Sequence, residues 1–136
     1  MVLDTSAIVA ILLNEPERHR FTRLIEAAPF RRLSAASRVE ATLVIEGRKR
    51  AAGRADLDLF LSEAEVEIVP VTLEQAELAC EAFRRFGKGR DPAALNFGDV
   101  FAYALARATG EPLLFKGDDF AQTTSRALPE MTQRKS

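Results

Sequence analysis

The sequence predicts a three-layer α/β fold, in which helices flank a central parallel sheet of four to five strands. Short apolar runs rich in β-branched residues alternate with longer stretches of helical periodicity along the whole chain. The first apolar run begins at residue 1 and ends with Val2-Leu3, and we expect it to form the middle strand of the sheet. At 136 residues and 47% hydrophobic content, the chain suits one domain over residues 1–136, with 126–136 as a loose polar tail.

The predicted elements alternate between strand and helix. Strands are expected at Val2-Leu3, 32–35, 66–71 and 113–115. Helices are expected from Thr5 to the break at 14–16, from Pro16 to about Ala28, from about Ser37 to a stop at Gly53, over 55–64, from Thr72 to Phe86, and over 100–109. Loops with glycine or proline separate them, the most prominent being 87–92.

Several short signals predict helix ends. Thr72 with Gln75 forms a capping-box pattern, and Ser37 with Glu40 forms a second. Gly110 is the expected C-cap of the alanine-rich helix. Arg48, Lys49 and Arg50 suit the negative end of a helix dipole.

Composition limits the functional classes. A net charge of -1 provides no global field for nucleic acid, so any such binding needs a local patch. Cys80 has no cysteine partner and is expected to be a small buried residue, which fits a reducing, cytoplasmic setting. No apolar run approaches the roughly 18 to 20 residues of a membrane span. His19 is expected at the surface.

Acidic residues stand at four predicted corners between strand and helix. Asp4 follows the first strand, Glu40 the second, Asp99 opens the alanine-rich helix, and Asp118-Asp119 follow the last strand. Because the carboxyl ends of parallel strands lie on one edge of a sheet, these side chains can converge.

Each acid also has a structural explanation. Asp4 can cap its helix, Glu40 can complete the box with Ser37, Asp99 can stabilise a helix dipole, and Asp118-Asp119 can be turn residues. Two negative charges about 4 Å apart nevertheless repel by about 1 kcal/mol even in water, so a cluster of acids requires a counter-charge. Mg²⁺ or Mn²⁺ would supply it, because hard cations prefer oxygen ligands, whereas His19 and Cys80 offer no zinc ligand set.

The chain resembles the PIN-domain ribonucleases, and within them the VapC toxins of bacterial type II toxin-antitoxin pairs. The motifs that carry the resemblance span most of the chain in the expected order. They are Val2-Leu3-Asp4-Thr5-Ser6, Ser34-Ala35-Ala36-Ser37-Arg38-Val39-Glu40-Ala41, Leu95-Asn96-Phe97-Gly98-Asp99 and Leu113-Leu114-Phe115-Lys116-Gly117-Asp118-Asp119-Phe120.

The resemblance implies a PIN-like fold, hydrolysis of RNA phosphodiester bonds and a divalent metal ion. It assigns Asp4, Glu40, Asp99 and Asp118 as catalytic carboxylates, with Asp4, Asp99 and Asp118 as metal ligands and Asp119 as the alternative fourth acid. Thr5 and Ser6 would offer hydroxyl groups near the metal or a phosphate. The resemblance also implies a VapB-type antitoxin partner and a homodimer.

Local positive charge offers candidate RNA contacts. They are Arg84, Arg85, Lys88, Arg90 and Lys116, which can also be plain solvated side chains.

The apolar faces of 21–25 and 57–61 are candidates for protein contacts, or they simply pack in the core. The alternative function is a non-cleaving RNA- or protein-binding module on the same fold. A phospho-acceptor domain is a poor fit because Asp4 stands alone and 69–72 contains no acid.

Overall fold

A parallel sheet forms the centre of the molecule in a computed structural model that describes residues 1–87 and 95–117. Its strands are short and include many buried residues. They are β1 (Val2–Leu3), β2 (Arg32–Ser34), β3 (Glu67–Val69) and β4 (Leu113–Leu114). Every pairing is parallel and the order is β3-β2-β1-β4, so the prediction of β1 as an interior strand is confirmed.

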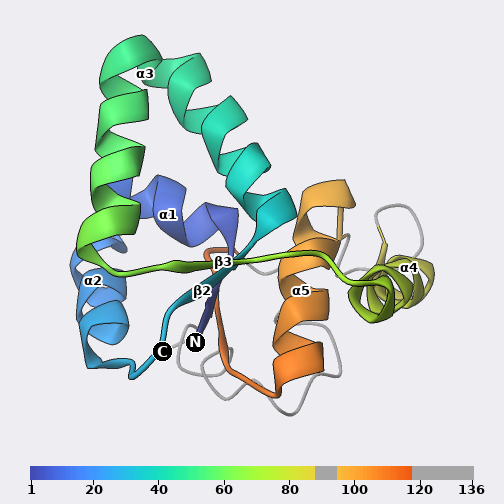
Figure 1. Ribbon diagram of the computed structural model, residues 1–136. Coiled ribbons are helices and arrows are strands. Elements are labelled where there is room, and N and C mark those ends of the chain that lie inside the picture. Colours follow the sequence, from blue (N-terminus) through green and yellow to red (C-terminus); the bar gives the residue numbers. More distant parts are fainter. Residues whose placement is uncertain (88–94, 118–136) are drawn as a thin grey trace.

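Helices cover both faces of the sheet. They are α1 (Thr5–Leu12), α2 (Arg18–Ala27), α3 (Ala35–Glu63), α4 (Leu73–Phe86) and α5 (Phe97–Thr109). In Figure 1, α1, α2 and α3 lie to one side of the strands, and α4 and α5 lie to the other. The predicted three-layer α/β architecture is therefore confirmed.

The alternation of side chains along the strands divides the core into two parts. Val2 and Leu113 pack with α4 and α5, whereas Leu3 and Leu114 pack with α1, α2 and α3. Successive residues of a strand point to opposite faces, so neighbouring residues of β1 and β4 anchor the two helical layers. Because both faces are covered, these strands consist of continuous apolar residues.

The strand order places a topological switch point beside β1. The chain passes from β1 to β2 and β3 in one direction, and then returns through α4 and α5 to β4 on the other side of β1. In open α/β sheets, ligands bind in the crevice outside the carboxyl ends of the strands at such a point. Asp4, directly after β1, stands at this crevice.

The structure corrects the predicted bounds of α3. Its N-cap is Ser34, whose hydroxyl accepts a hydrogen bond from the amide of Ala36 at 3.2 Å, so Ser37 lies inside the helix. The predicted capping box of Ser37 with Glu40 is therefore wrong. The hydrogen-bonded strand runs to Ser34, and helix begins as soon as that pairing stops.

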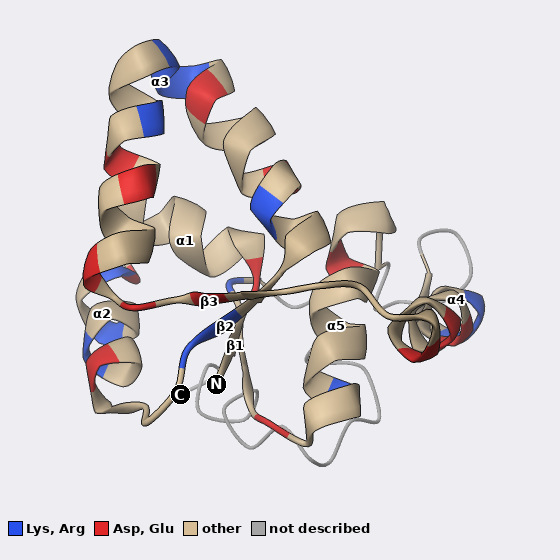
Figure 2. Ribbon diagram, viewed as in Figure 1, with Lys and Arg blue, Asp and Glu red and all other residues tan. Residues whose placement is uncertain are grey.

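The predicted division into two helices is confirmed, because the helical backbone is interrupted at Arg50 (φ 57°, ψ −137°), but the predicted position of the break at Gly53 is wrong. The second half of α3 includes Gly53 and runs to Glu63. A Cβ on Gly53 would stand 2.6 Å from the carbonyl oxygen of Ile45, so this glycine permits close packing of the two halves of α3. Lys and Arg residues gather around the turn (Figure 2).

Other local predictions have mixed outcomes. Thr72 accepts from the amide of Gln75 at 3.1 Å, but the Gln75 side-chain oxygen has no partner, so the predicted box is half formed. Gly110 closes α5 with φ 71°, as predicted. Cys80 is exposed, contrary to prediction, and His19 is exposed on α2, as expected. No helix within residues 1–87 and 95–117 is both long and apolar enough to span a membrane.

Candidate functional site

Asp4 lies at the corner between β1 and α1, and only one of its two carboxylate oxygens is satisfied. Its Oδ2 accepts a hydrogen bond from the Ser6 amide at 2.9 Å, which makes Asp4 the N-cap of α1. Its Oδ1 is buried without a hydrogen-bond partner, and the residue is 3% exposed. A buried acceptor that lacks a partner costs free energy. The capping role accounts for Oδ2 but gives no reason for a buried Oδ1 without a donor.

The electrostatic surroundings of Asp4 disfavour its charge. Its pKa is raised from 3.8 to about 7, mainly by burial and also by the charges of Asp99 and Glu40, while the hydrogen bonds from Ser6 oppose the rise. The fields of Asp99 and Glu40 both reach Asp4, so acids from three separate crossovers lie at one edge of the sheet. A cation there would offset the cost of an ionised Asp4.

Asp99 is held rigidly in the first turn of α5. Its Oδ2 accepts from the amide of Asn96 at 3.0 Å, and the Asn96 side chain accepts in return from the amide of Asp99 at 3.0 Å. This reciprocal capping box fixes the rotamer of an acid that is 8% exposed. The structural role expected for Asp99 was stabilisation of the helix dipole, although the spacing of Asn96 and Asp99 already carried the capping signal.

Glu40 reaches the same edge from α3 and packs against the backbone of Gly98. A Cβ built on Gly98 would overlap the Glu40 carboxylate, so only glycine leaves room for this approach. Gly98 directly precedes Asp99, and its missing side chain therefore lets the start of α5 approach Glu40. We identified no role for Gly98 from the sequence, since the glycine is recognisable only once α3 and α5 are seen together.

The described residues contain part of the predicted acid cluster. Asp4, Glu40 and Asp99 share an edge, while Asp118 and Asp119 lie outside the described residues. Within the described ranges, no three His, Cys, Asp or Glu residues are close enough to hold one metal ion together. The partnerless Oδ1 of Asp4 and the all-oxygen character of the donors nevertheless suit a hard divalent cation such as Mg²⁺ or Mn²⁺.

The hydroxyl groups of Thr5 and Ser6 brace the Asp4 corner. Thr5 donates to the carbonyl of Ser37 at 3.1 Å, which ties α1 to the first turn of α3. The Ser6 hydroxyl accepts from the backbone amide of Lys116 at 2.9 Å, which ties α1 to the end of β4. Both side chains have structural tasks, and their predicted support of a metal or phosphate stays a prediction.

The ammonium group of Lys116 pairs with Glu15 and Glu17 and not with the predicted catalytic acids. Its ammonium group donates to Glu15 at 2.6 Å and lies 3.4 Å from Glu17. The hydrogen bond to Glu15 raises the pKa of Lys116. These contacts disfavour the predicted role in RNA binding, and they give Lys116 no part in neutralising Asp4.

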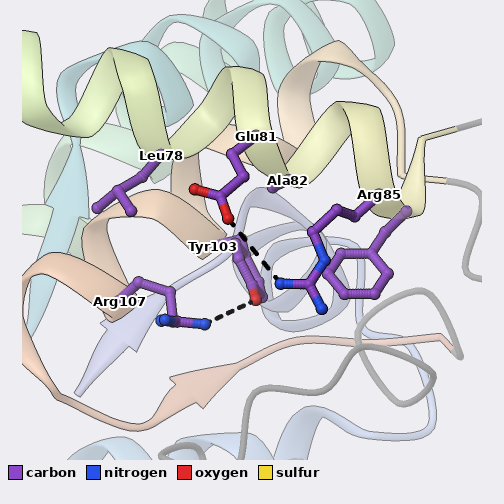
Figure 3. Close-up of a pocket in the computed structure, with 7 residues that line it drawn as sticks. Leu78, Glu81, Ala82, Arg85, Tyr103 and Arg107 are labelled. Atoms are coloured by element: carbon purple, nitrogen blue, oxygen red, sulfur yellow. Dashed lines mark hydrogen bonds and ion pairs between the residues drawn. The ribbon is translucent and has the colours of Figure 1, made fainter.

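The remaining candidate RNA contacts lie on or after α4. Arg84 and Arg85 are exposed, and Lys88 and Arg90 lie outside the described residues. Arg85 stands 3.9 Å from Glu81 and 5.0 Å from the centre of the Phe86 ring, next to a small pocket that Tyr103 also lines (Figure 3). Arg84 lines a separate apolar groove of about 640 Å³ between α4 and α5.

The predicted protein-contact faces turn out to be largely core. Phe21, Ile25 and Leu57 are almost fully buried. Large exposed apolar side chains occur elsewhere, notably Leu43 on α3 and Phe97 at the start of α5. Sequence periodicity does not distinguish a face that packs internally from one that packs on a partner.

Comparison with known proteins identifies the family. The model of the PIN domain matches residues 1–125, which is most of the chain. The chain belongs to the PIN-domain family. The curated "VapC ribonuclease Mb0640" from Mycobacterium bovis is 50% identical to this PIN domain over 131 residues, covering 95% of this chain and 100% of the relative.

Solved structures share the fold of this PIN domain at low sequence identity. VapC20 from Mycobacterium tuberculosis, described as a sarcin-ricin loop cleaving toxin, superposes with a TM-score of 0.70 at 23% identity, covering 88% of this chain and 92% of its own. VapBC2 from Rickettsia felis, bound to a promoter DNA fragment, gives a TM-score of 0.71 at 16% identity, covering 91% of this chain and 92% of its own. The predicted PIN-like fold is confirmed.

Proposed function

We propose that this PIN domain is the toxin of a type II toxin-antitoxin pair and acts as a divalent-metal-dependent endoribonuclease. The observation that carries the proposal is the half-satisfied, buried carboxylate of Asp4 within the fields of Asp99 and Glu40. Identity of 50% to a VapC ribonuclease over nearly the full chain supports ribonuclease chemistry.

Asp4, Asp99 and Asp118 are the proposed ligands of Mg²⁺ or Mn²⁺, with Asp119 as the alternative to Asp118. A divalent ion held there would lower the pKa of a bound water and offset negative charge on the scissile phosphate. Oxygen ligands and substrate phosphates are the usual surroundings of Mg²⁺, which matches this donor set.

The protein's own residues orient the reactants. The Ser6 amide holds Oδ2 of Asp4, so Oδ1 is left for the cation. Asn96 holds one oxygen of Asp99 in the same way. Glu40 is half-buried beside Gly98, and we propose that its carboxylate accepts a hydrogen bond from the attacking water and then its proton.

The proposed partners follow from the relatives. An RNA is the substrate, and a VapB-type antitoxin is the inhibitor, by analogy with the VapBC2 assembly. A homodimer and a cytoplasmic location remain predictions. An antitoxin that neutralises this site would be expected to contact the acids with a basic or bulky side chain.

The test is cleavage of total RNA with Mg²⁺, with Mn²⁺ and with a chelator, analysed on a denaturing gel. We expect the wild-type protein to cut only with a divalent ion, and Asp4→Asn to be inactive while still folded. The matched control is Asp58→Asn, which changes an exposed acid paired with Arg38 on α3 and should retain activity. Retention of RNA without cleavage by the wild-type protein would instead support the non-cleaving binding module.

A further inference from the structure

The turn of α3 carries a concentration of positive charge that the proposed catalytic site does not use. Arg48, Lys49, Arg50 and Arg54 fall within one short stretch that contains no acid, in a chain whose net charge is -1. The stretch surrounds the kink of α3 at Arg50, and Figure 2 shows Lys and Arg positions at this turn, away from the sheet. A local basic patch is what nucleic-acid binding would require of a protein without a global positive field.

Three of these four side chains have no partner among residues 1–87 and 95–117. Lys49 donates to Asp56 at 2.6 Å and thereby links the two halves of α3. Arg48, Arg50 and Arg54 are exposed and form no ion pair or hydrogen bond with any residue in 1–87 or 95–117. Their guanidinium groups are therefore available to an external anion, and guanidinium groups match phosphate geometry well.

The backbone at Arg50 gives an independent indication. Its φ of 57° and ψ of −137° fall in a backbone region that residues other than glycine rarely adopt and that glycine adopts readily. For folding alone, glycine would be the less strained residue at this kink. An arginine that is exposed and without a partner at such a position suggests that its side chain serves an interaction outside the fold.

The turn also lies on the side of the molecule where the acids converge. Helix α3 starts at the carboxyl end of β2, passes Glu40 and runs outward from the sheet before it turns (Figure 1). With a rise of about 1.5 Å per residue, Arg48 lies about 12 Å beyond Glu40 along the helix. A stacked strand advances about 3.4 Å per nucleotide, so about four nucleotides cover this distance.

We propose that Arg48, Arg50 and Arg54 form a second contact for the RNA backbone, about four nucleotides from the phosphate that would be hydrolysed at the acids. This inference rests on the proposed ribonuclease function and names a substrate-positioning surface for it. Contacts to phosphates position a strand without reading its sequence. The arginines therefore contribute affinity that depends on the length of the RNA and on salt.

The first experiment measures binding in the Asp4→Asn background, so that cleavage does not interfere. Labelled random-sequence RNA of about 20 nucleotides and a pool of about four nucleotides are titrated by fluorescence anisotropy across a range of salt. Replacing Arg48, Arg50 and Arg54 with Ala should reduce the slope of log affinity against log salt by about 0.7 per lost contact, about 2 in total. The matching loss of affinity for the longer RNA is up to about 100-fold near 0.1 M salt.

The shorter RNA pool should bind the triple variant and its parent almost equally. The matched control is Arg23→Ala, which removes an exposed arginine from α2 and should leave the slope unchanged. Equal slopes for the triple variant and its parent on the longer RNA would overturn the inference. A loss of affinity of the same size for both RNA lengths would also overturn it, because the contact would then not be remote.

A second variant separates RNA binding from folding. Arg50→Gly relieves the strained backbone, so its melting temperature should be at least that of the parent, while its affinity for the longer RNA falls. Glycine that both stabilises the protein and leaves RNA affinity unchanged would refute the role of Arg50. Cleavage of total RNA by the otherwise wild-type protein tests the nuclease function separately, so failure of the arginine contact leaves that result standing.

Discussion

The replacement of Asp4 by Asn should stabilise the metal-free protein, and increasingly so as pH rises. The folded protein holds the pKa of Asp4 at about 7, against an ordinary value of 3.8, mainly because the side chain is buried. This difference corresponds to about 4 kcal/mol between the protonated and ionised forms. It is a large share of the roughly 5–15 kcal/mol by which domains are usually stable.

The sign follows from proton linkage. Because the folded state binds this proton more tightly than the unfolded state, stability from protonated Asp4 is fully present below about pH 3.8 and is lost as pH rises through about 7. Asparagine is neutral at every pH and can still accept the hydrogen bond from the Ser6 amide. The advantage of Asp4→Asn over the wild type should therefore grow from about 2 kcal/mol near pH 5 to about 4 kcal/mol above pH 7.

The assay is chemical denaturation of both proteins with a chelator present, over about pH 5 to 9, with Asp58→Asn as the exposed control. Addition of Mg²⁺ or Mn²⁺ should then stabilise the wild-type protein, because an ion that binds only the folded state shifts the equilibrium by mass action. The same ions should have little effect on Asp4→Asn. Stability curves of wild type and Asp4→Asn that run parallel across this pH range would refute the electrostatic reasoning.

Three further predictions test other parts of the structure. Gly98→Ala should push the Glu40 carboxylate aside and lower cleavage, at a cost in stability below about 1 kcal/mol because that carboxylate is the end of a flexible, half-buried side chain; an unchanged cleavage rate would contradict the close approach. Lys116→Met should cost no more than about 1 kcal/mol, because its ion pairs are partly exposed, and should leave the salt dependence of RNA binding unchanged; a shallower slope would make Lys116 an RNA contact after all. Gly53→Ala should lower the melting temperature, because the new methyl group would meet the Ile45 carbonyl, and a neutral result would mean that the two halves of α3 separate at little cost.

The best sequence predictions rest on neighbours in the chain. The alternation of strands and helices, the cap at Thr72, the left-handed Gly110 and the corner position of Asp4 all depend on residues a few positions apart. Short-range hydrogen bonds and backbone preferences decide such features, and they act before the fold is complete. The interior position of β1 was also correctly predicted, and both of its residues are fully buried between the two helical layers.

The wrong predictions concern choices among equivalent local signals. Ser34 and Ser37 could each cap α3, and the end of strand pairing at Ser34 selected the first. Gly53 had the composition of a helix stop, but contact with Ile45 makes it a packing residue. Cys80 had a helical setting compatible with burial, yet its side of α4 lines an open groove.

The sequence by itself determined which chemistry is available: acids at the strand-to-helix corners, oxygen donors for a hard cation, and motifs of the PIN family. Only the tertiary structure decided that Asp4 keeps one buried oxygen without a partner, that Gly98 admits Glu40, and that Lys116 is paired elsewhere. The reason is physical. Residue types and local spacing specify donors, charges and caps, whereas desolvation and close approach depend on elements that are distant in the chain and meet only when the layers pack.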